Sequence, residues 1–125
     1  MLLDSHSAWW LLADQKRIGK TLRQKLERHH ACFYSSVSVF ELFEKSRKGK
    51  LRVPDNLVDL MQQAGLLELQ LNSKHTYDSQ FISAQIYDPF DRILLAQAQF
   101  EKIDFYTGDS KILSLGLDFV KDVSL

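Results

Sequence analysis

Residues 88–109 read DPFDRILLAQAQFEKIDFYTGD, and this stretch joins a helix signal to a strand signal. Proline is favoured at the first position of a helix, so we predict that a helix begins at Pro89 with Asp88 before it. The short apolar run at 103–106 predicts a strand, and Asp109 follows it after a two-residue turn. A helix that leads into a short apolar strand is typical of α/β folds.

Short apolar segments alternate with amphipathic segments along the rest of the chain. We expect strands at residues 1–3, 32–34, 66–71 and 103–106, and an edge strand at 117–120. We expect helices at residues 8–12, 18–26, 39–48 and 110–115, and helices that begin at Pro54, Ser73 and Pro89. The helix from Ser73 is expected to carry Tyr77, Phe81 and Ala84. This alternation favours a parallel sheet covered by helices, so we predict an α/β sandwich.

The length of 125 residues and the hydrophobic content of 45% fit one domain, which we expect to cover residues 1–125. No window approaches the roughly 18 uninterrupted apolar residues that a membrane span needs. The first three residues lead directly into Asp4 without the features of a signal peptide, so a cytoplasmic location is expected. The single cysteine, Cys32, lies in an apolar run and is expected to be a core residue.

The formal net charge is zero, but charge is unevenly distributed along the chain. Residues 1–52 contain eleven Lys and Arg against five Asp and Glu, whereas residues 53–125 contain five against eleven. Five cations are concentrated in residues 45–52: Lys45, Arg47, Lys48, Lys50 and Arg52. Such a cluster can neutralise backbone phosphates, although a solvated helix end explains it equally well from the residues alone.

Four acids stand where predicted strands end or predicted helices begin. Asp4 follows the first strand, and Asp109 follows the fourth. Glu41 lies three residues after Ser38, and Asp91 lies three residues after Asp88. Serine and aspartate are both residue types that cap helices. The carboxyl ends of parallel strands meet at one edge of the sheet, and the next helices begin there. We therefore expect the four carboxylates to converge.

A purely structural explanation exists for each of these acids. Ser38-Val39-Phe40-Glu41 reads as a capping box, and Asp88-Pro89-Phe90-Asp91 is a close equivalent with proline at the first helical position. Asp4 and Asp109 can each cap the helix that follows. Capping is the commoner role for any one of them, so the set is more informative than its members.

Carboxylates gathered within a few ångströms repel one another, and proton uptake or a bound cation relieves the repulsion. Oxygen ligands without His or Cys favour Mg²⁺, or Mn²⁺, over zinc. Such an ion can bind a phosphate, activate water and stabilise the leaving oxygen. The acids therefore indicate phosphodiester hydrolysis, with Asp4, Glu41, Asp91 and Asp109 as metal ligands and catalytic residues.

The sequence resembles the PIN-domain nucleases, and among them the VapC-type toxins of bacterial toxin-antitoxin pairs. Four groups of residues, spread over nearly the whole chain, carry this resemblance. They are Leu2-Leu3-Asp4-Ser5-His6; Ser38-Val39-Phe40-Glu41 with Lys45, Arg47 and Gly49-Lys50-Leu51; Asp88-Pro89-Phe90-Asp91-Arg92 with Leu94-Leu95-Ala96-Gln97-Ala98; and Thr107-Gly108-Asp109. Each motif is short, and their common order and spacing make the resemblance specific.

The resemblance implies a three-layer α/β/α sandwich around a mostly parallel sheet of about five strands. It also implies a Mg²⁺-dependent endoribonuclease site built from the four acids, all of which are present. It further implies a homodimer, and a small antitoxin whose C-terminal segment lies across the active-site groove. Trp9, Trp10 and Phe43 are candidates to contact that segment, although their helical spacing fits core aromatics better.

Further candidates stand beside the acids. Ser5, Asp88, Arg92 and Thr107 are expected to support the carboxylates or contact substrate, with helix capping or turn formation as the alternative. Lys45, Arg47 and Lys50 are expected to bind RNA. The sequence departs from the family at Phe40, where many relatives carry tryptophan, and at Ile86-Tyr87, where a basic or His-containing pair is common.

Two other functions compete with the ribonuclease. A non-catalytic PIN-like module that binds RNA or protein would keep the fold and use the acids only as caps. A phosphotransfer domain fits less well, because haloacid-dehalogenase-like sites carry a second aspartate where this chain has His6.

Overall fold

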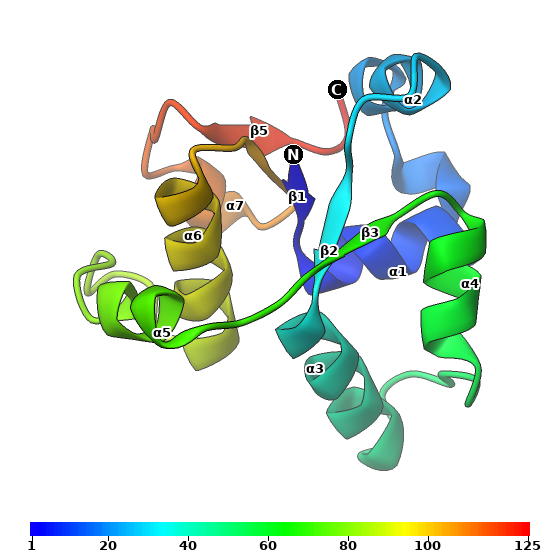
Figure 1. Ribbon diagram of the computed structural model, residues 1–125, viewed down its shortest axis with the longest axis horizontal. Helices are drawn as coiled ribbons and strands as arrows, with labels where there is room; N and C mark the ends of the chain where they lie inside the picture. Colours follow the sequence, from blue (N-terminus) through cyan, green and yellow to red (C-terminus); the bar gives the residue numbers. More distant parts are fainter.

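A five-stranded parallel sheet forms the centre of the computed structural model, which describes residues 1–125 (Figure 1). Its strands are β1 (Leu2–Leu3), β2 (Phe33–Ser35), β3 (Leu67–Leu69), β4 (Phe105–Thr107) and β5 (Val120–Asp122). They lie in the order β3-β2-β1-β4-β5, so the first strand is the central one. Leu2 pairs with residues of both neighbouring strands, Phe33 and Phe105.

Seven helices connect these strands. They are α1 (Ser5–Ala13), α2 (Lys20–Glu27), α3 (Ser36–Arg47), α4 (Leu57–Gln63), α5 (Ser73–Ser79), α6 (Pro89–Glu101) and α7 (Ser110–Leu113), with a short 3-10 helix at Gln15–Arg17. Figure 1 shows α1, α2 and α4 to the right of the sheet and α5, α6 and α7 to its left. The sheet therefore lies between two helical layers, which confirms the predicted α/β/α sandwich.

The two faces of the sheet contribute to two separate hydrophobic clusters, because successive side chains of a strand point to opposite sides. Leu3, Tyr34 and Tyr106 pack with residues of α1, α2, α3 and α4. Leu2 and Phe105 pack with residues of α6 and α7 on the other face. Both faces of the strands are thus covered, as expected for a parallel sheet.

The beginning of α3 differs from the prediction. The helix starts at Ser36 rather than at residue 39, and the hydroxyl of Ser35 accepts the capping hydrogen bond from the amide of Val37 at 3.1 Å. The predicted capping box of Ser38 and Glu41 is therefore wrong. Ser35 is the last residue of β2, so the helix begins directly where the strand ends. Glu41 consequently lies in the second turn.

Other boundaries also shift. The helix predicted from Pro54 begins at Leu57, after a turn closed by the Leu57 amide and the Pro54 carbonyl. The helix predicted from Ser73 is capped by Asn72 and ends at Ser79, so it does not reach the exposed Phe81.

The reason for the Asn72 cap is a local pair of hydrogen bonds. The Asn72 side chain accepts from the His75 amide, and the His75 ring accepts from the Asn72 amide.

The boundaries of two strands also differ from the prediction. Strand β3 is shorter than residues 66–71, and the predicted edge strand lies at Val120–Asp122 rather than at 117–120.

Cys32 is buried in the larger hydrophobic cluster, which confirms its prediction as a core residue. Burial raises the pKa of its thiol to about 12, so the reactive thiolate is strongly disfavoured. None of the helices combines the length and the apolar character that crossing a bilayer requires.

Candidate active site

The four predicted acids line one cleft of about 280 Å³ at the carboxyl ends of the strands. Asp4 follows β1, Asp109 follows β4, and Glu41 and Asp91 lie on α3 and α6. Strands β2 and β4 lie on opposite sides of the central strand β1, so the connections from the ends of β1 and β4 run in opposite directions. Diverging connections open a crevice at this edge of the sheet, and ligands of open α/β sheets bind in such crevices.

Asp4 is held by hydrogen bonds to both of its carboxylate oxygens. Its Oδ1 accepts from the Ser7 amide at 2.7 Å, so Asp4 caps α1, and its Oδ2 accepts from the Thr107 hydroxyl at 2.6 Å. Burial raises the pKa of Asp4, and the two donors lower it in part. Capping and a position in the cleft are therefore compatible roles for this residue.

Glu41 is buried on α3 and is oriented by a residue of α1. The Ser5 hydroxyl lies 2.6 Å from Oε1 of Glu41 and 2.9 Å from the hydroxyl of Ser38. A hydroxyl has a single proton, so Ser5 donates to the carboxylate and accepts from Ser38. The second oxygen of Glu41 lies 3.6 Å from Nζ of Lys45. Three residues from two helices thus position this carboxylate.

Asp91 differs from its neighbours because no protein group donates a hydrogen bond to its carboxylate. Asp88, at the start of the same helix, uses its Oδ1 to cap the amides of Phe90 and Asp91 at 2.8 and 3.3 Å. Partial burial raises the pKa of Asp91 from 3.8 to about 7, and repulsion from the other cleft acids adds to the shift. The largest repulsion comes from Asp88.

Asp109 stands at the rim of the cleft. It is exposed, and its Oδ1 accepts from the Lys111 amide at 2.8 Å, so it caps the short helix α7. Its own amide donates to the hydroxyl of Thr107 at 3.0 Å. Thr107 therefore contacts both Asp4 and Asp109 and ties the ends of β1 and β4 together.

Five carboxylates face this cleft, but no three of them form a compact group of metal ligands. They surround the space rather than meet at one point. The donor set consists of oxygen atoms and suits a hard divalent cation such as Mg²⁺. The repulsion felt by Asp91 is the physical sign that the cleft favours positive charge.

The other predicted residues divide into two groups. Ser5 and Thr107 hydrogen-bond to site carboxylates, and Asp88 and Lys45 line the cleft itself. Arg92 does not line it. Its guanidinium donates instead to three backbone carbonyls of the segment 79–86, at 2.8 to 3.1 Å, and so supports the loop before α6.

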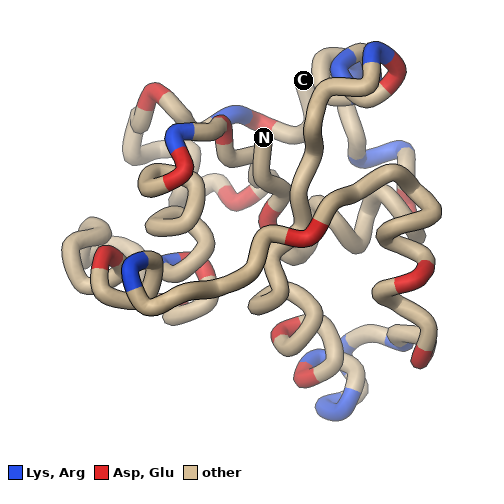
Figure 2. The backbone as a smooth tube through the Cα atoms, in the orientation of Figure 1, with Lys and Arg blue, Asp and Glu red and all other residues tan.

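The predicted RNA-binding cations are also divided. Lys45 pairs with Glu41 inside the cleft, whereas Arg47 forms an exposed pair with Glu44 at 2.8 Å. Lys50 lines a depression next to the cleft. Figure 2 shows the basic cluster at the lower end of α3, adjacent to the acidic positions of the same helix.

His6 and Gly108 line the cleft although the motifs did not single them out as site residues, and Trp10, a candidate to contact the antitoxin segment, lines it as well. The sequence could have indicated that His6 and Trp10 lie together, because residues four apart share one face of a helix. Gly108 is needed for packing, since a Cβ atom there would lie 2.8 Å from Cζ3 of Trp10. Trp9 and Phe43 pack against the hydrophobic core, as their spacing favoured.

Two solved structures share this fold over nearly their full length. One is a chain of a toxin-antitoxin complex from Klebsiella pneumoniae, with a TM-score of 0.66, 18% identity, and coverage of 96% of this chain and 94% of that one. The other is a chain of VapBC2 from Rickettsia felis, crystallised with a DNA fragment from its promoter, with a TM-score of 0.69, 13% identity, and coverage of 97% and 96%. No protein-family model matches the sequence, and no curated protein does. This chain therefore has the PIN-like fold that its motifs predicted, a fold it shares with chains of the Klebsiella pneumoniae complex and of VapBC2.

Proposed function

We propose that this chain is a metal-dependent endoribonuclease and the toxin of a toxin-antitoxin pair. The observation that carries the proposal is the cleft in which Asp4, Glu41, Asp91 and Asp109 face one another at the carboxyl edge of a parallel sheet. Partial burial raises the pKa of Asp91 to about 7, and the repulsion that the neighbouring carboxylates add to this shift favours a cation in the cleft. The fold shared with chains of toxin-antitoxin complexes supports the biological role.

The four acids would hold Mg²⁺, with Mn²⁺ as the alternative. When bound, such an ion supplies a Lewis acid for the phosphate and an activated water for hydrolysis. The residues of the chain prepare the site for this chemistry. Ser5 orients Glu41, and Thr107 orients Asp4, so that two of the carboxylates are fixed by hydrogen bonds. Supporting hydrogen bonds of this kind set ligand geometry and affinity.

Asp91 and Lys45 have different tasks in this proposal. The Asp91 carboxylate is free of hydrogen bonds and thus remains available to an incoming cation. Lys45 lies beside Glu41, 3.6 Å from its carboxylate, and its ammonium could turn from there to a substrate phosphate. RNA is the proposed substrate, and a homodimer and a small antitoxin that covers the cleft are the proposed assembly.

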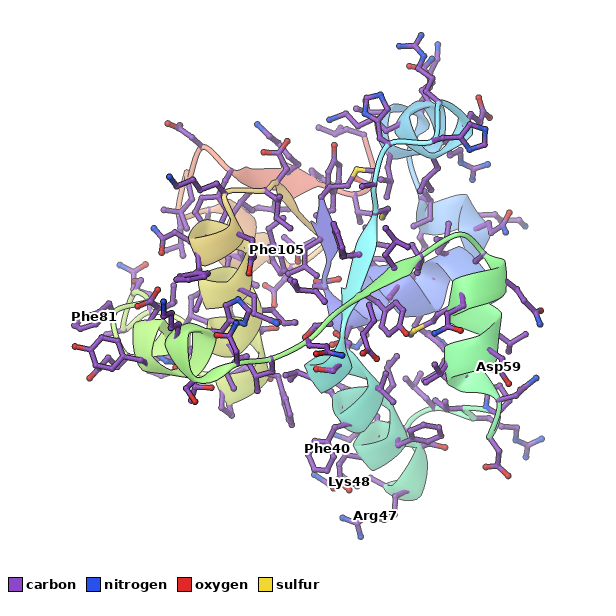
Figure 3. The ribbon with its side chains drawn as sticks, in the orientation of Figure 1. Phe40, Arg47, Lys48, Asp59, Phe81 and Phe105 are labelled. Carbon is purple, nitrogen blue, oxygen red and sulfur yellow. The ribbon has the colours of Figure 1, made fainter.

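Cleavage of total RNA by matched variants tests the proposal. Asp4→Asn and Asp91→Asn should remove Mg²⁺-dependent cleavage while the circular dichroism spectrum stays unchanged. Asp59→Asn is the control, because Asp59 is an exposed acid on α4, far from the cleft (Figure 3). Mapping the cleavage ends would identify the RNA. Equal cleavage by Asp4→Asn and the parent protein would refute the nuclease.

A second candidate is a non-catalytic binding module with the same fold. The observation in its favour is that Asp4, Asp88 and Asp109 each accept a helix-capping hydrogen bond, so capping alone explains three of the acids. Asn caps helices about as well as Asp, so stability hardly separates the two functions. Calorimetric titration with Mg²⁺ separates them. Saturable heat of Mg²⁺ binding that is lost in Asp91→Asn supports the enzyme, and the absence of such heat in the parent protein supports the module.

A further inference from the structure

The acidic cleft is the middle part of a longer trough. A depression of about 180 Å³ on one side shares Glu41, Lys45 and Asp88 with the cleft. A depression of about 270 Å³ on the other side shares Asp88, Asp91 and Asp109 with it. Shared lining residues make the three spaces neighbours, so an extended ligand can lie along them and cross the carboxylates.

Two phenylalanines mark the first end of the trough. Phe40 precedes Glu41 on α3, Phe90 precedes Asp91 on α6, and their ring centroids lie 5.9 Å apart with planes tilted by 46°. The side chain of Phe40 is 59% exposed, although phenylalanine is usually buried. An exposed ring beside a polar cleft offers a flat apolar surface to a ligand.

The same end carries two lysines, beside Glu44, that form no ion pair. Lys48 and Lys50 line the depression together with Phe90, and neither forms an ion pair within 4.0 Å. Figure 3 shows Phe40 and Lys48 on the same side of α3, while Arg47 projects from its lower end. Aromatic and cationic groups are therefore combined on one side of the trough.

The opposite end repeats this combination. Tyr87 directly precedes Asp88, is 87% exposed, and lines the depression beyond the cleft. Lys111 lines the same depression and also has no ion pair. Each side of the carboxylates thus presents an exposed aromatic ring and an unpaired lysine.

We propose that the trough binds single-stranded RNA, with one base stacked on Phe40 and Phe90 and another on Tyr87, on the two sides of the phosphate at the carboxylates. Proteins that hold single strands combine a cationic path for the phosphates with aromatic rings for the bases. A duplex is excluded from this mode, because its bases are already stacked on one another.

This assignment rests on RNA as the substrate of the proposed enzyme and adds which residues contact its bases. Stacking accepts any base, so the two rings set where bases lie on either side of the cleavage point, whereas the lysines contact phosphates.

Binding with Ca²⁺ in place of Mg²⁺ tests the assignment by a readout other than cleavage, because Ca²⁺ also binds carboxylate oxygens and offsets their repulsion of phosphates. The probe is a short fluorescein-labelled single-stranded RNA of mixed sequence, titrated with the full chain and followed by anisotropy. Phe40→Leu and Tyr87→Leu should each weaken binding by about fivefold to 100-fold, the range expected for loss of one stacked base. Phe81→Leu is the matched control, because Phe81 is 69% exposed but lies beyond α5, away from the trough (Figure 3).

Two further readouts separate stacking from general loss of affinity. A 2-aminopurine base in the RNA should lose fluorescence on binding to the parent chain, and Phe40→Leu should restore it. Lys48→Gln and Lys50→Gln should each reduce the slope of log K against log salt by about 0.7, the value for one phosphate contact on a single strand. Phe40→Leu should leave that slope unchanged.

The results that would contradict this assignment differ from those that would contradict the proposed enzyme. If the parent chain does not cut RNA but the ring variants still bind it more weakly than Phe81→Leu does, the stacking role stands. If Phe40→Leu and Tyr87→Leu bind single-stranded RNA as tightly as Phe81→Leu, the rings do not contact bases, and the exposed aromatic surface belongs to a protein partner instead.

Discussion

The hydroxyl of Thr107 donates a 2.6 Å hydrogen bond to Oδ2 of Asp4 and thereby links the carboxyl ends of β4 and β1. The same oxygen atom accepts from the amide of Asp109 at 3.0 Å. Thr107 is fully buried, and Asp4 is nearly so. Two acids from opposite ends of the chain are therefore positioned through one threonine.

Replacing Thr107 by valine should destabilise the protein by about 1–3 kcal/mol, because it leaves Oδ2 of Asp4 and the amide of Asp109 without this partner. Mg²⁺ binding should weaken by about tenfold or more, as is typical when a group that orients a metal ligand is lost. Urea denaturation and calorimetry measure the two effects. Thr107→Ser keeps the hydroxyl and should retain Mg²⁺ binding; equal binding by the valine and serine variants would contradict the role of the hydrogen bond.

The stability of the metal-free protein should depend on pH through Asp91. Its pKa is raised from 3.8 to about 7, so between these values the folded protein retains a proton that the unfolded chain releases. The free energy of unfolding therefore falls as pH rises through this window and levels off above it.

Asp91→Asn has no charge to repel the other carboxylates, and it should be more stable than the parent above about pH 7. Urea denaturation in EDTA at a series of pH values measures this. Asp59→Asn should follow the curve of the parent, and Mg²⁺ should flatten that curve. A parallel pH dependence in Asp91→Asn and the parent would show that another group is responsible.

Lys45 should have opposite effects on metal and RNA. Its Nζ lies 3.6 Å from Glu41 and competes with a cation for that carboxylate. Lys45→Gln is therefore expected to strengthen Mg²⁺ binding by about two- to fivefold, the range for a partly exposed ion pair, while it weakens RNA binding. Lys48→Gln is the control, since it has no acid within 4.0 Å and should affect only RNA. A loss of both affinities in Lys45→Gln would instead indicate a damaged cleft.

Gly108 should be sensitive to a single added methyl group. A Cβ atom at this position would lie 2.8 Å from Cζ3 of Trp10, so Gly108→Ala must displace the indole from the cleft wall. Overpacking of this kind costs about 1–3 kcal/mol. The double variant Gly108→Ala/Trp10→Leu should be less destabilised than the sum of the two single variants, as denaturation of all four proteins would show. Additive losses would mean that the two residues do not interact.

Local sequence signals predicted some helix ends well and others badly. Asp88 and Pro89 begin α6 as predicted, because a cap and the helix it starts are only a few residues apart. At α3 the candidates Ser35, Ser36 and Ser38 are equally suitable in local terms. The choice of Ser35 depends on where β2 ends, and that strand is paired with β1 and β3, so distant residues decide the helix start.

The sequence by itself determined the order of strands and helices, the burial of Cys32, and the positions of the four acids at strand ends and on helices. These features depend on periodicity and on neighbours within one or two turns. Only the tertiary structure decided that Ser5 holds Glu41, that Arg92 serves a loop, and that Phe40 and Tyr87 flank one trough. The burial, charge and hydrogen bonds of a side chain depend on which distant segment packs against it, and that is a property of the assembled sheet and its helices.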